Sequence, residues 1–495
     1  MEPVVADRGA ARGAGPRHGN LIGGAWRPSS GDAAYAIRNP ARPGEILGQF
    51  ADSTAADVAA AVDAASAATS EWADTPGPQR GAVLWRLADL LETSRDELAR
   101  IITLEQGKAL GEAAGEVGRA AAEARFMAGE ASRPTGSTYP SERPGLSCHT
   151  VAEPLGVVAT ISPWNFPVVT PVRKIAPALA WGNTVVFKPA SLTPWSAVYL
   201  MTLLERAGVP PGVVNLVTGS GSVAGEALIQ DRRVKGISFT GSTGVGTHVY
   251  EEAARRLARV QLELGGKNPA VVIESEDLDG AAREIVAAAF LCSGQRCTAL
   301  SRVIVSEAQA DALAARILDH VHRIKVGDGI DPGTTMGPLV SHAQLRSVEG
   351  YVRGGVESGC DLLAGGRALT KDPEHDGYYY APTVFDRVPA ASPLALEEIF
   401  GPVLPILRVR SFDEAMEIVN GTRYGLAASL FTARASYVHE FTRRAEAGMI
   451  HVNHGTASQA HVPFGGVKDS GQGAYSIGQT ARDFHTNVKA VYVKW

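Results

Sequence analysis

The chain has 495 residues, of which 45% are hydrophobic and 20% charged, and its formal net charge is −5. This is a globular composition, and the weak negative charge argues against nucleic acid or an acidic membrane surface as a partner. No apolar run is long enough for a membrane helix, and the 4 cysteines do not make a disulfide framework. We therefore expect a cytoplasmic, reduced protein.

The first third of the chain changes character twice. Residues 1–18 contain Arg, Gly and Ala without a continuous apolar stretch, so we expect a flexible tail and not a signal peptide. Residues 55–130 repeat apolar positions at helical spacing and are predicted to form helices. Residues 131–154 are rich in Pro, Ser and Gly, which favours a linker or a protruding arm.

A strict alternation of short β-rich runs and helical segments begins near residue 156. The predicted strands are "GVVATIS", "NTVVFKPA", "GVVNLVTG", "VKGISFTG" and "RVQLELGG". The alternation predicts a parallel sheet covered by helices, with ligands at the carboxyl ends of its strands. A second α/β alternation is predicted over about 268–470. The final "NVKAVYVKW" has strand composition and needs a partner sheet, which another subunit would be able to supply.

Two glycine-rich loops compete as phosphate-binding turns. "TGSGSVAG" (218–225) and "FTGSTGVG" (239–246) each follow a strand and open a helix, where free N–H groups and the helix dipole attract a pyrophosphate. Neither has P-loop spacing, and either can equally be a tight strand–helix turn. Lys188 in "FKPAS" is a candidate ribose or phosphate ligand, although lysines at strand ends are more often simply solvated.

The stretch "FLCSGQRCTALSR" contains Cys292 and Cys297, for which three roles compete: metal ligand, packed thiol and nucleophile. Their spacing does not fit a zinc pair and no His pair stands nearby, so we expect no metal. A nucleophilic thiol needs a lowered pKa or a nearby base, for which Glu263 in "ELGGKNP" is a candidate. The amide of Asn165, held between aromatic residues and a proline in "PWNFP", is a candidate donor to an oxyanion.

The motifs resemble those of the aldehyde dehydrogenase superfamily. "SPWNFP", "FTGSTGVG", "LELGGKNP", "GQRC", "EEIFGP" and "PFGGVKDSG" occur in that family's order over about residues 19–495, with a texture close to succinate-semialdehyde and α-ketoglutarate-semialdehyde dehydrogenases. The resemblance implies an α/β protein with three parts: a Rossmann-like parallel-sheet coenzyme domain, an α/β catalytic domain, and a small β unit that bridges the subunits of a homodimer or homotetramer. The corresponding ranges are 19–130 with 155–265, then 266–470, then 131–154 with 471–495.

The resemblance also implies roles for single residues. Cys297 would attack the aldehyde, Asn165 and the Cys297 N–H would hold the oxyanion, and Glu263 would activate water to hydrolyse the thioester. NAD or NADP would be bound by Trp164, Lys188, Ser191, Gly225, Gly241, Ser242, Leu264, Glu398 and Phe400. Ser191 stands where relatives strict for NAD often carry Glu, and its neutrality favours acceptance of NADP.

The predicted substrate is a short aldehyde with an anionic group, such as a semialdehyde. Arg173 follows Asn165 by about two helical turns and would bind the carboxylate; alternatively, it pairs with a protein carboxylate. Leu291 replaces the second Arg of succinate-semialdehyde relatives. The predicted substrate-binding residues are Phe166, Arg173, Arg296, Ser458, Gln459, His461 and Phe464.

Other functions are compatible with parts of the sequence. In one alternative, the protein is a dehydrogenase of an uncharged or a phosphonate-bearing aldehyde. A CoA-acylating relative would lack Glu263, and a catalytically silent homologue would have lost the Cys, Glu or Asn. All three residues are intact in this sequence.

Overall fold

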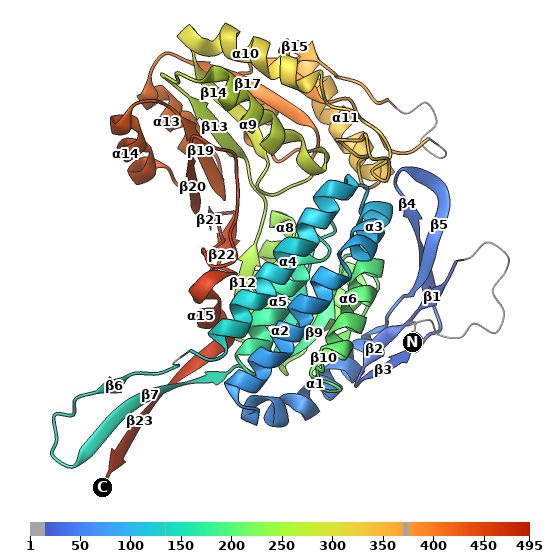
Figure 1. Cartoon of the computed structure of the whole chain (residues 1–495), viewed down its shortest axis with the longest axis vertical. Helices are drawn as coiled ribbons and strands as arrows, with labels where there is room; N and C mark the ends of the chain where they lie inside the picture. Colours follow the sequence, from blue (N-terminus) through green and yellow to red (C-terminus); the bar gives the residue numbers. More distant parts are fainter. Residues whose placement is uncertain (1–14, 134, 370–375) are drawn as a thin grey trace.

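The computed structural model describes residues 15–133, 135–369 and 376–495. Two helix-covered β-sheets form the body of the molecule, and a β arm projects from it (Figure 1). Residues 1–14 of the predicted tail lie outside the described residues. Arg17–His18 form β1 and pair with β5 (Arg42–Ala51), so the predicted tail of 1–18 is wrong at its last two residues.

Helices fill the region between residues 55 and 130, as their apolar spacing predicts. A capping box starts the first of them, because the Thr54 side chain accepts from the N–H of Asp57 and Asp57 reaches back to Thr54. The third ends at Gly107, whose φ of 100° favours glycine. The helices are α1 (Ala55–Asp74), α2 (Gly77–Thr93), α3 (Arg95–Gln106) and α4 (Leu110–Glu130).

The first sheet has the strand order β22-β12-β11-β8-β9-β10-β2-β3, and its five central strands are parallel. The chain runs from β8 through β9 to β10 on one side, and returns to the other side of β8 for β11 and β12. Ligands of open parallel sheets bind where the order reverses in this way, here between the carboxyl ends of β8 and β11. "SPWNFP" and "FTGSTGVG" lie at those two ends.

The predicted alternation over 156–265 is confirmed element by element. The strands are β8 (Val157–Ile161), β9 (Thr184–Lys188), β10 (Val214–Leu216), β11 (Val234–Thr240) and β12 (Arg259–Glu263), joined at the far edge by β2 (Asn20–Ile22) and β3 (Ala25–Arg27). The helices are α5 (Val169–Ala180), α6 (Pro194–Arg206), α7 (Glu226–Gln230) after a π-helical turn (Gly221–Gly225), and α8 (Thr243–Ala254). β4 (Ala34–Asn39) pairs with β5 outside this sheet.

The second sheet, of order β15-β16-β17-β14-β13-β19-β20, is parallel except at β15. Its strands are β13 (Asn268–Val272), β14 (Leu300–Ser306), β15 (Asp361–Ala364), β16 (Thr383–Asp386), β17 (Val403–Val409), β19 (Ala427–Phe431) and β20 (Met449–Val452). Its helices are α9 (Leu278–Phe290), α10 (Glu307–Val321), α11 (His342–Glu357), α12 (Pro393–Leu396), α13 (Phe412–Asn420) and α14 (Ala435–Arg444). The short strands β18 (Tyr424–Gly425), β21 (Val467–Lys468) and β22 (Gly471–Gln472) lead back to the first sheet.

The C-terminal strand finds its partner within the chain. After α15 (Ala481–His485), β23 (Thr486–Lys494) pairs antiparallel with β7 (Leu146–Pro154), and β6 (Thr138–Tyr139) completes a three-stranded arm that extends away from the body (Figure 1). A neighbouring subunit is therefore not needed to pair this strand. In the described ranges, none of the helices combines the length and apolarity that a membrane crossing requires.

Candidate active site

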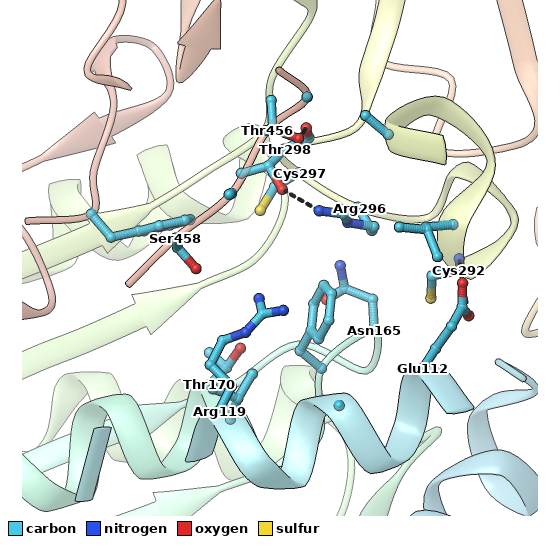
Figure 2. A pocket seen from close by; sticks show the side chains of 18 of the residues that line it. Glu112, Arg119, Asn165, Thr170, Cys292, Arg296, Cys297, Thr298, Thr456 and Ser458 are labelled. Atoms are coloured by element: carbon cyan, nitrogen blue, oxygen red, sulfur yellow. Dashed lines mark hydrogen bonds between the residues drawn. The ribbon is translucent and has the colours of Figure 1, made fainter. Parts of the chain in front are cut away.

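A cavity of about 420 Å³ lies beside the switch point of the first sheet. Its walls come from α4, α5, the segment after β8, the loop that carries Cys297, and the loop 454–458 (Figure 2). Cys297, Asn165 and Glu263, which the sequence places far apart, all line it. The fold thus brings the three predicted catalytic residues to one site.

The loop before Cys297 is tightly held. Cys292 and Ser293 have φ values of 54° and 57°, a left-handed conformation that costs energy in residues other than glycine. A Cβ on Gly294 would lie 2.2 Å from the carbonyl oxygen of Gly401, so only glycine fits there. The Cys297 carbonyl accepts a hydrogen bond of 2.7 Å from Asn268. These contacts fix the backbone of Cys297 relative to β13 of the second sheet.

Asn165 is preorganised as a hydrogen-bond donor. Its buried amide donates at 2.9 Å to the carbonyl of Gln295, and an amide NH₂ has a second hydrogen to offer. The backbone N–H of Cys297 makes no hydrogen bond to any described residue. Among the described residues, two N–H groups of cavity-lining residues therefore have no acceptor, as donors to an oxyanion require.

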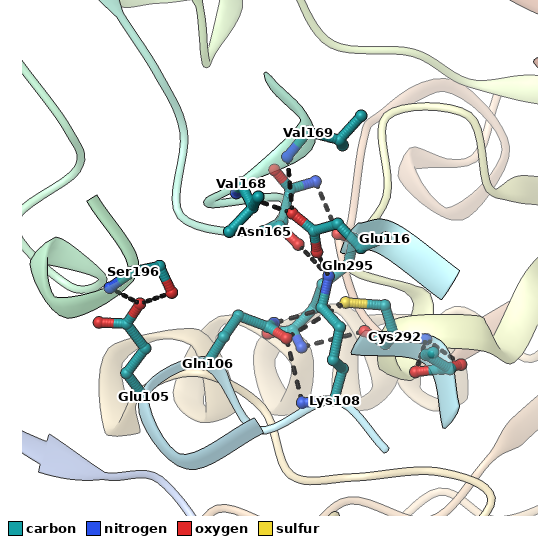
Figure 3. A network of polar contacts seen from close by, with 11 residues as sticks. Glu105, Gln106, Lys108, Glu116, Asn165, Val168, Val169, Ser196, Cys292 and Gln295 are labelled. Atoms are coloured by element: carbon teal, nitrogen blue, oxygen red, sulfur yellow. Dashed lines mark hydrogen bonds and ion pairs between the residues drawn. The ribbon is translucent and has the colours of Figure 1, made fainter. Parts of the chain in front are cut away.

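A buried polar network contacts the backbone of Asn165 (Figure 3). Lys108 Nζ donates to the Asn165 carbonyl at 2.6 Å and forms a 2.7 Å ion pair with Glu116. Glu116 also accepts from the N–H groups of Val168 and Val169 at 2.9 and 3.1 Å, where α5 starts. The pair thus ties α4 to the loop that carries Asn165.

Glu263 ends β12 inside the protein. Its Oε1 accepts from Gln261 at 2.9 Å, and Gln261 in turn accepts from Lys174 at 3.3 Å. Burial raises the pKa of Glu263 to about 7, against the opposing effect of the Lys174 and Arg173 charges. Burial likewise raises the pKa of Cys297 to about 12, with Glu398 and Glu263 adding to the shift. Burial thus favours the neutral form of both the Cys297 thiol and the Glu263 carboxyl.

The loop 239–246 forms a cradle at the end of β11. Ser242 precedes α8 without capping it through its side chain. A Cβ on Gly246 would lie 2.2 Å from a methyl of Leu264, and one on Gly241 would lie 2.5 Å from the Phe239 ring. The absence of side chains lets α8 pack closely and leaves its first N–H groups available to an anion.

The other glycine-rich loop meets Lys188. A Cβ on Gly225 would lie 3.7 Å from the Lys188 stem, and Lys188 Nζ donates to the carbonyl of Pro189 at 2.8 Å. Burial lowers the pKa of Lys188 to about 8. Ser191 is exposed in the turn that follows. The helix start of α8 and the buried Lys188 at the end of β9 are two features of the kind that a dinucleotide site uses.

The remaining predicted cofactor residues lie where the two sheets meet. Glu398 accepts from the N–H of Gly266 at 3.0 Å, and burial raises its pKa to about 7. The rings of Trp164 and Phe400 meet edge to face with centroids 5.3 Å apart. Glu398 thus provides a carboxyl group, and Trp164 and Phe400 an aromatic pair, in the predicted cofactor region.

The predicted substrate-binding residues divide into two groups. Phe166, Arg173, Arg296, Ser458 and Phe464 line the cavity. Gln459 and His461 are exposed and do not line it, and the His461 ring instead lies 6.5 Å from that of Phe126.

Arg173 is not free to bind an anion as expected. Its Nη2 and Nε donate to the two carboxylate oxygens of Glu123 at 2.6 and 3.2 Å, and its guanidinium lies 4.4 Å from the centre of the Phe464 ring. The alternative stated for it, an ion pair with a protein carboxylate, is what the structure contains.

The sequence motifs did not predict that side chains of α4 line the cavity. Glu112 and Arg119 line the cavity, while Glu116 and Glu123 lie behind it in ion pairs. The signal was a charged stripe at spacings of four, three and four residues along an alanine-rich helix, which places all four side chains on one face. Cys292 and Glu284 line the cavity as well.

A doubly wound parallel sheet beside a cavity that holds a thiol, an amide and a buried carboxyl is typical of nicotinamide-dependent oxidoreductases. Residues 26–491 match the model of the aldehyde dehydrogenase family, so the chain belongs to that family. It is an NAD(P)-dependent aldehyde dehydrogenase, and the resemblance and α/β fold class inferred from the motifs are confirmed.

Two curated relatives and one solved structure illustrate the similarity. The chain is 41% identical over 476 residues to the α-ketoglutaric semialdehyde dehydrogenase of Bacillus subtilis (strain 168), covering 96% of this chain and 98% of the relative. It is 38% identical over 453 residues to the succinate-semialdehyde dehydrogenase [NADP(+)] of Escherichia coli (strain K12), covering 92% and 93%. The crystal structure of an E. coli NADP dependent enzyme superposes with a TM-score of 0.94 at 35% identity, covering 97% of this chain and 98% of that one.

Proposed function

We propose that the protein oxidises a short ω-semialdehyde, an aldehyde that carries a carboxylate, to the corresponding dicarboxylic acid. The observation that carries the proposal is a cavity in which Cys297, Asn165 and Glu263 share walls with Arg119 and Arg296, neither of which forms an ion pair with another described residue. Cationic walls favour an anionic substrate. Relatives named for α-ketoglutaric and succinate semialdehydes support the same substrate class.

Cys297 is the proposed nucleophile. Its sulfur adds to the aldehyde carbon, the thiol proton leaves to a base, and the new oxyanion accepts hydrogen bonds from Asn165 and from the Cys297 N–H. A preorganised donor of this kind lowers the barrier by about 3–4 kcal/mol. Bound NAD or NADP would supply the acceptor for the hydride that the adduct's carbon must lose, and this loss leaves the substrate as a thioester on Cys297.

Glu263 is the proposed base of the second half-reaction. It takes a proton from water, whose oxygen adds to the carbonyl carbon of the Cys297 thioester. The carbon–sulfur bond then breaks, the thiolate leaves, and the carboxylic acid is released. Its raised pKa suits a group that must both accept and release a proton near neutral pH.

The remaining assignments complete the proposal. Residues 19–130 and 155–265 form the coenzyme domain, 266–470 the catalytic domain, and 131–154 with 471–495 a unit that joins subunits of a cytoplasmic homodimer or homotetramer.

Both cofactors are accepted, because the exposed, neutral Ser191 does not repel a 2′-phosphate as a carboxylate would. Separate titrations with NAD and NADP at saturating aldehyde measure this, and binding of NAD alone would contradict it.

The two cavity cysteines give a matched test of the nucleophile. Cys297→Ala is expected to abolish oxidation of succinate semialdehyde, whereas Cys292→Ala keeps most of it. The physical reason is that the Cys292 thiol is buried among Gln106 and Lys108 and contacts that network. Loss of activity in Cys292→Ala with retention in Cys297→Ala would overturn the assignment.

A further inference from the structure

The cavity contains an arginine, Arg119, that forms no hydrogen bond or ion pair with any other described residue. Resting on the proposed function, we infer that Arg119, together with Arg296, forms the subsite for the substrate's remote carboxylate, and that Arg173 does not. The three guanidinium groups differ in whether a protein carboxylate pairs with them, and this difference supports the inference.

Arg173 is already neutralised. Two of its nitrogens donate to Glu123 in a paired geometry, and the two side chains are only 8% and 2% exposed. A second carboxylate approaching this pair would meet a net charge near zero and would compete with a preformed bidentate contact. Arg173 therefore serves to anchor α5 to α4 beside the cavity.

Arg119 has no such partner. It projects from α4 into the cavity (Figure 2) and forms no hydrogen bond or ion pair with any residue in the described ranges. Arg125, on the same helix, pairs at the surface with Asp89 and Glu92. Burial, followed by the charges of Arg173 and Arg296, lowers the pKa of Arg119. An anion at this point would relieve that repulsion.

Arg296 is similarly undersatisfied. Its Nη2 donates to the Thr298 hydroxyl at 3.3 Å, but its Nε is buried and makes no hydrogen bond within the described part of the chain. A buried N–H without an acceptor is costly, and a ligand oxygen would satisfy it.

The three acidic side chains of the cavity make other contacts, and Glu263 accepts a hydrogen bond from Gln261. Glu112 accepts from the N–H of Cys292 at 3.0 and 3.2 Å, and burial raises its pKa towards the neutral form. Glu284 accepts from the N–H of Gly455 at 3.2 Å and lies 3.8 Å from Arg283. Among the described residues, Arg119 thus has no hydrogen-bond acceptor and the buried Nε of Arg296 has none either. A planar guanidinium pairs well with a carboxylate, which selects an ω-carboxy aldehyde.

Arg119→Gln tests the inference with two aldehydes of equal chain length, glutarate semialdehyde and pentanal. We expect KM for the semialdehyde to rise about 10- to 100-fold, as loss of a charge-assisted contact predicts, with kcat and the kinetics of pentanal changed less than about twofold. Arg119→Lys should recover part of the loss. Arg125→Gln is the matched control, because it removes the same charge from the same helix outside the cavity and should leave both substrates unaffected.

Three outcomes would overturn the inference. Equal losses for both aldehydes would mean that Arg119 is structural. An unchanged KM for the semialdehyde would assign its carboxylate to another group, and a larger effect on phosphonoacetaldehyde would assign the subsite to a phosphonate. A wild-type enzyme that does not prefer the semialdehyde to pentanal would instead defeat the proposed substrate class itself, before any variant is compared.

Discussion

Glu263 shows at the scale of one residue how burial creates a base that works near neutral pH. Its pKa of about 7 lies above the ordinary carboxyl value because burial disfavours the charged form. Thioester hydrolysis needs the deprotonated form. We therefore expect kcat to fall as pH decreases through about 7, and this acid limb to vanish in Glu263→Gln.

Rapid mixing separates the two halves of the reaction in the same variant. Glu263→Gln should give a burst of reduced cofactor, equivalent to about one turnover, followed by little more. The Gln side chain is nearly isosteric and is able to keep the contact with Gln261. If neither burst nor turnover were seen, Glu263 would also be required to activate Cys297.

Single residues differ in how well the sequence revealed them. Cys297, Glu263 and Asn165 could be predicted because each lies in a short motif whose neighbouring residues suit the proposed chemistry. Arg119 sits in no motif, since "GRAAAEA" reads as an ordinary helical surface. Only the position of α4 over the cavity makes Arg119 a candidate ligand.

At the scale of an element, α4 combines packing with site support. Lys108, just before the helix, and Glu116 within it form an ion pair whose side chains are 1% and 0% exposed. A buried pair of this kind is strongly destabilising when one partner is removed, because the other charge stays buried.

Glu116→Leu should therefore lower the free energy of unfolding by about 3–5 kcal/mol, measured by urea denaturation. The double variant Lys108→Met/Glu116→Leu should recover most of that loss. Both should reduce kcat, because the Asn165 loop loses the contacts that hold it. Arg125→Gln, which breaks only exposed ion pairs of the same helix, should change stability by less than about 1 kcal/mol.

A Glu116→Leu protein as stable as wild type would show that Lys108 is solvated or neutral without its partner. A double variant with full kcat would show that the Asn165 loop does not depend on the network. The two results are independent, since one concerns stability and the other geometry.

At the scale of the whole molecule, the β arm exposes an apolar face that no other part of the described chain covers. β23 is an edge strand of its sheet, and it exposes 75% of Val488 and 69% of Tyr492 on one face. An edge strand with exposed apolar side chains is a ready template for association.

We predict that Val488→Asp/Tyr492→Asp yields a smaller assembly than wild type, measured by light scattering after size exclusion. The charged side chains should make burial of this face costly. Lys489→Gln on the same strand, which removes an exposed pairing with Glu153, should leave the assembly unchanged. An unaltered mass in the double variant would place the subunit contact elsewhere.

The sequence by itself determined the type and order of the elements and the three residues of the proposed chemistry. Apolar periodicity and turn residues are local, so the alternation of strands and helices over 156–265 could be read directly, as could the motifs around Cys297 and Glu263. Tertiary structure decided what depends on residues far apart in the chain. Glu123 neutralises Arg173 across 50 residues because α4 packs on α5, and β23 pairs with β7 because the chain returns to its own arm. No local pattern encodes which of several arginines receives a partner, because that choice is made only when the helices pack together.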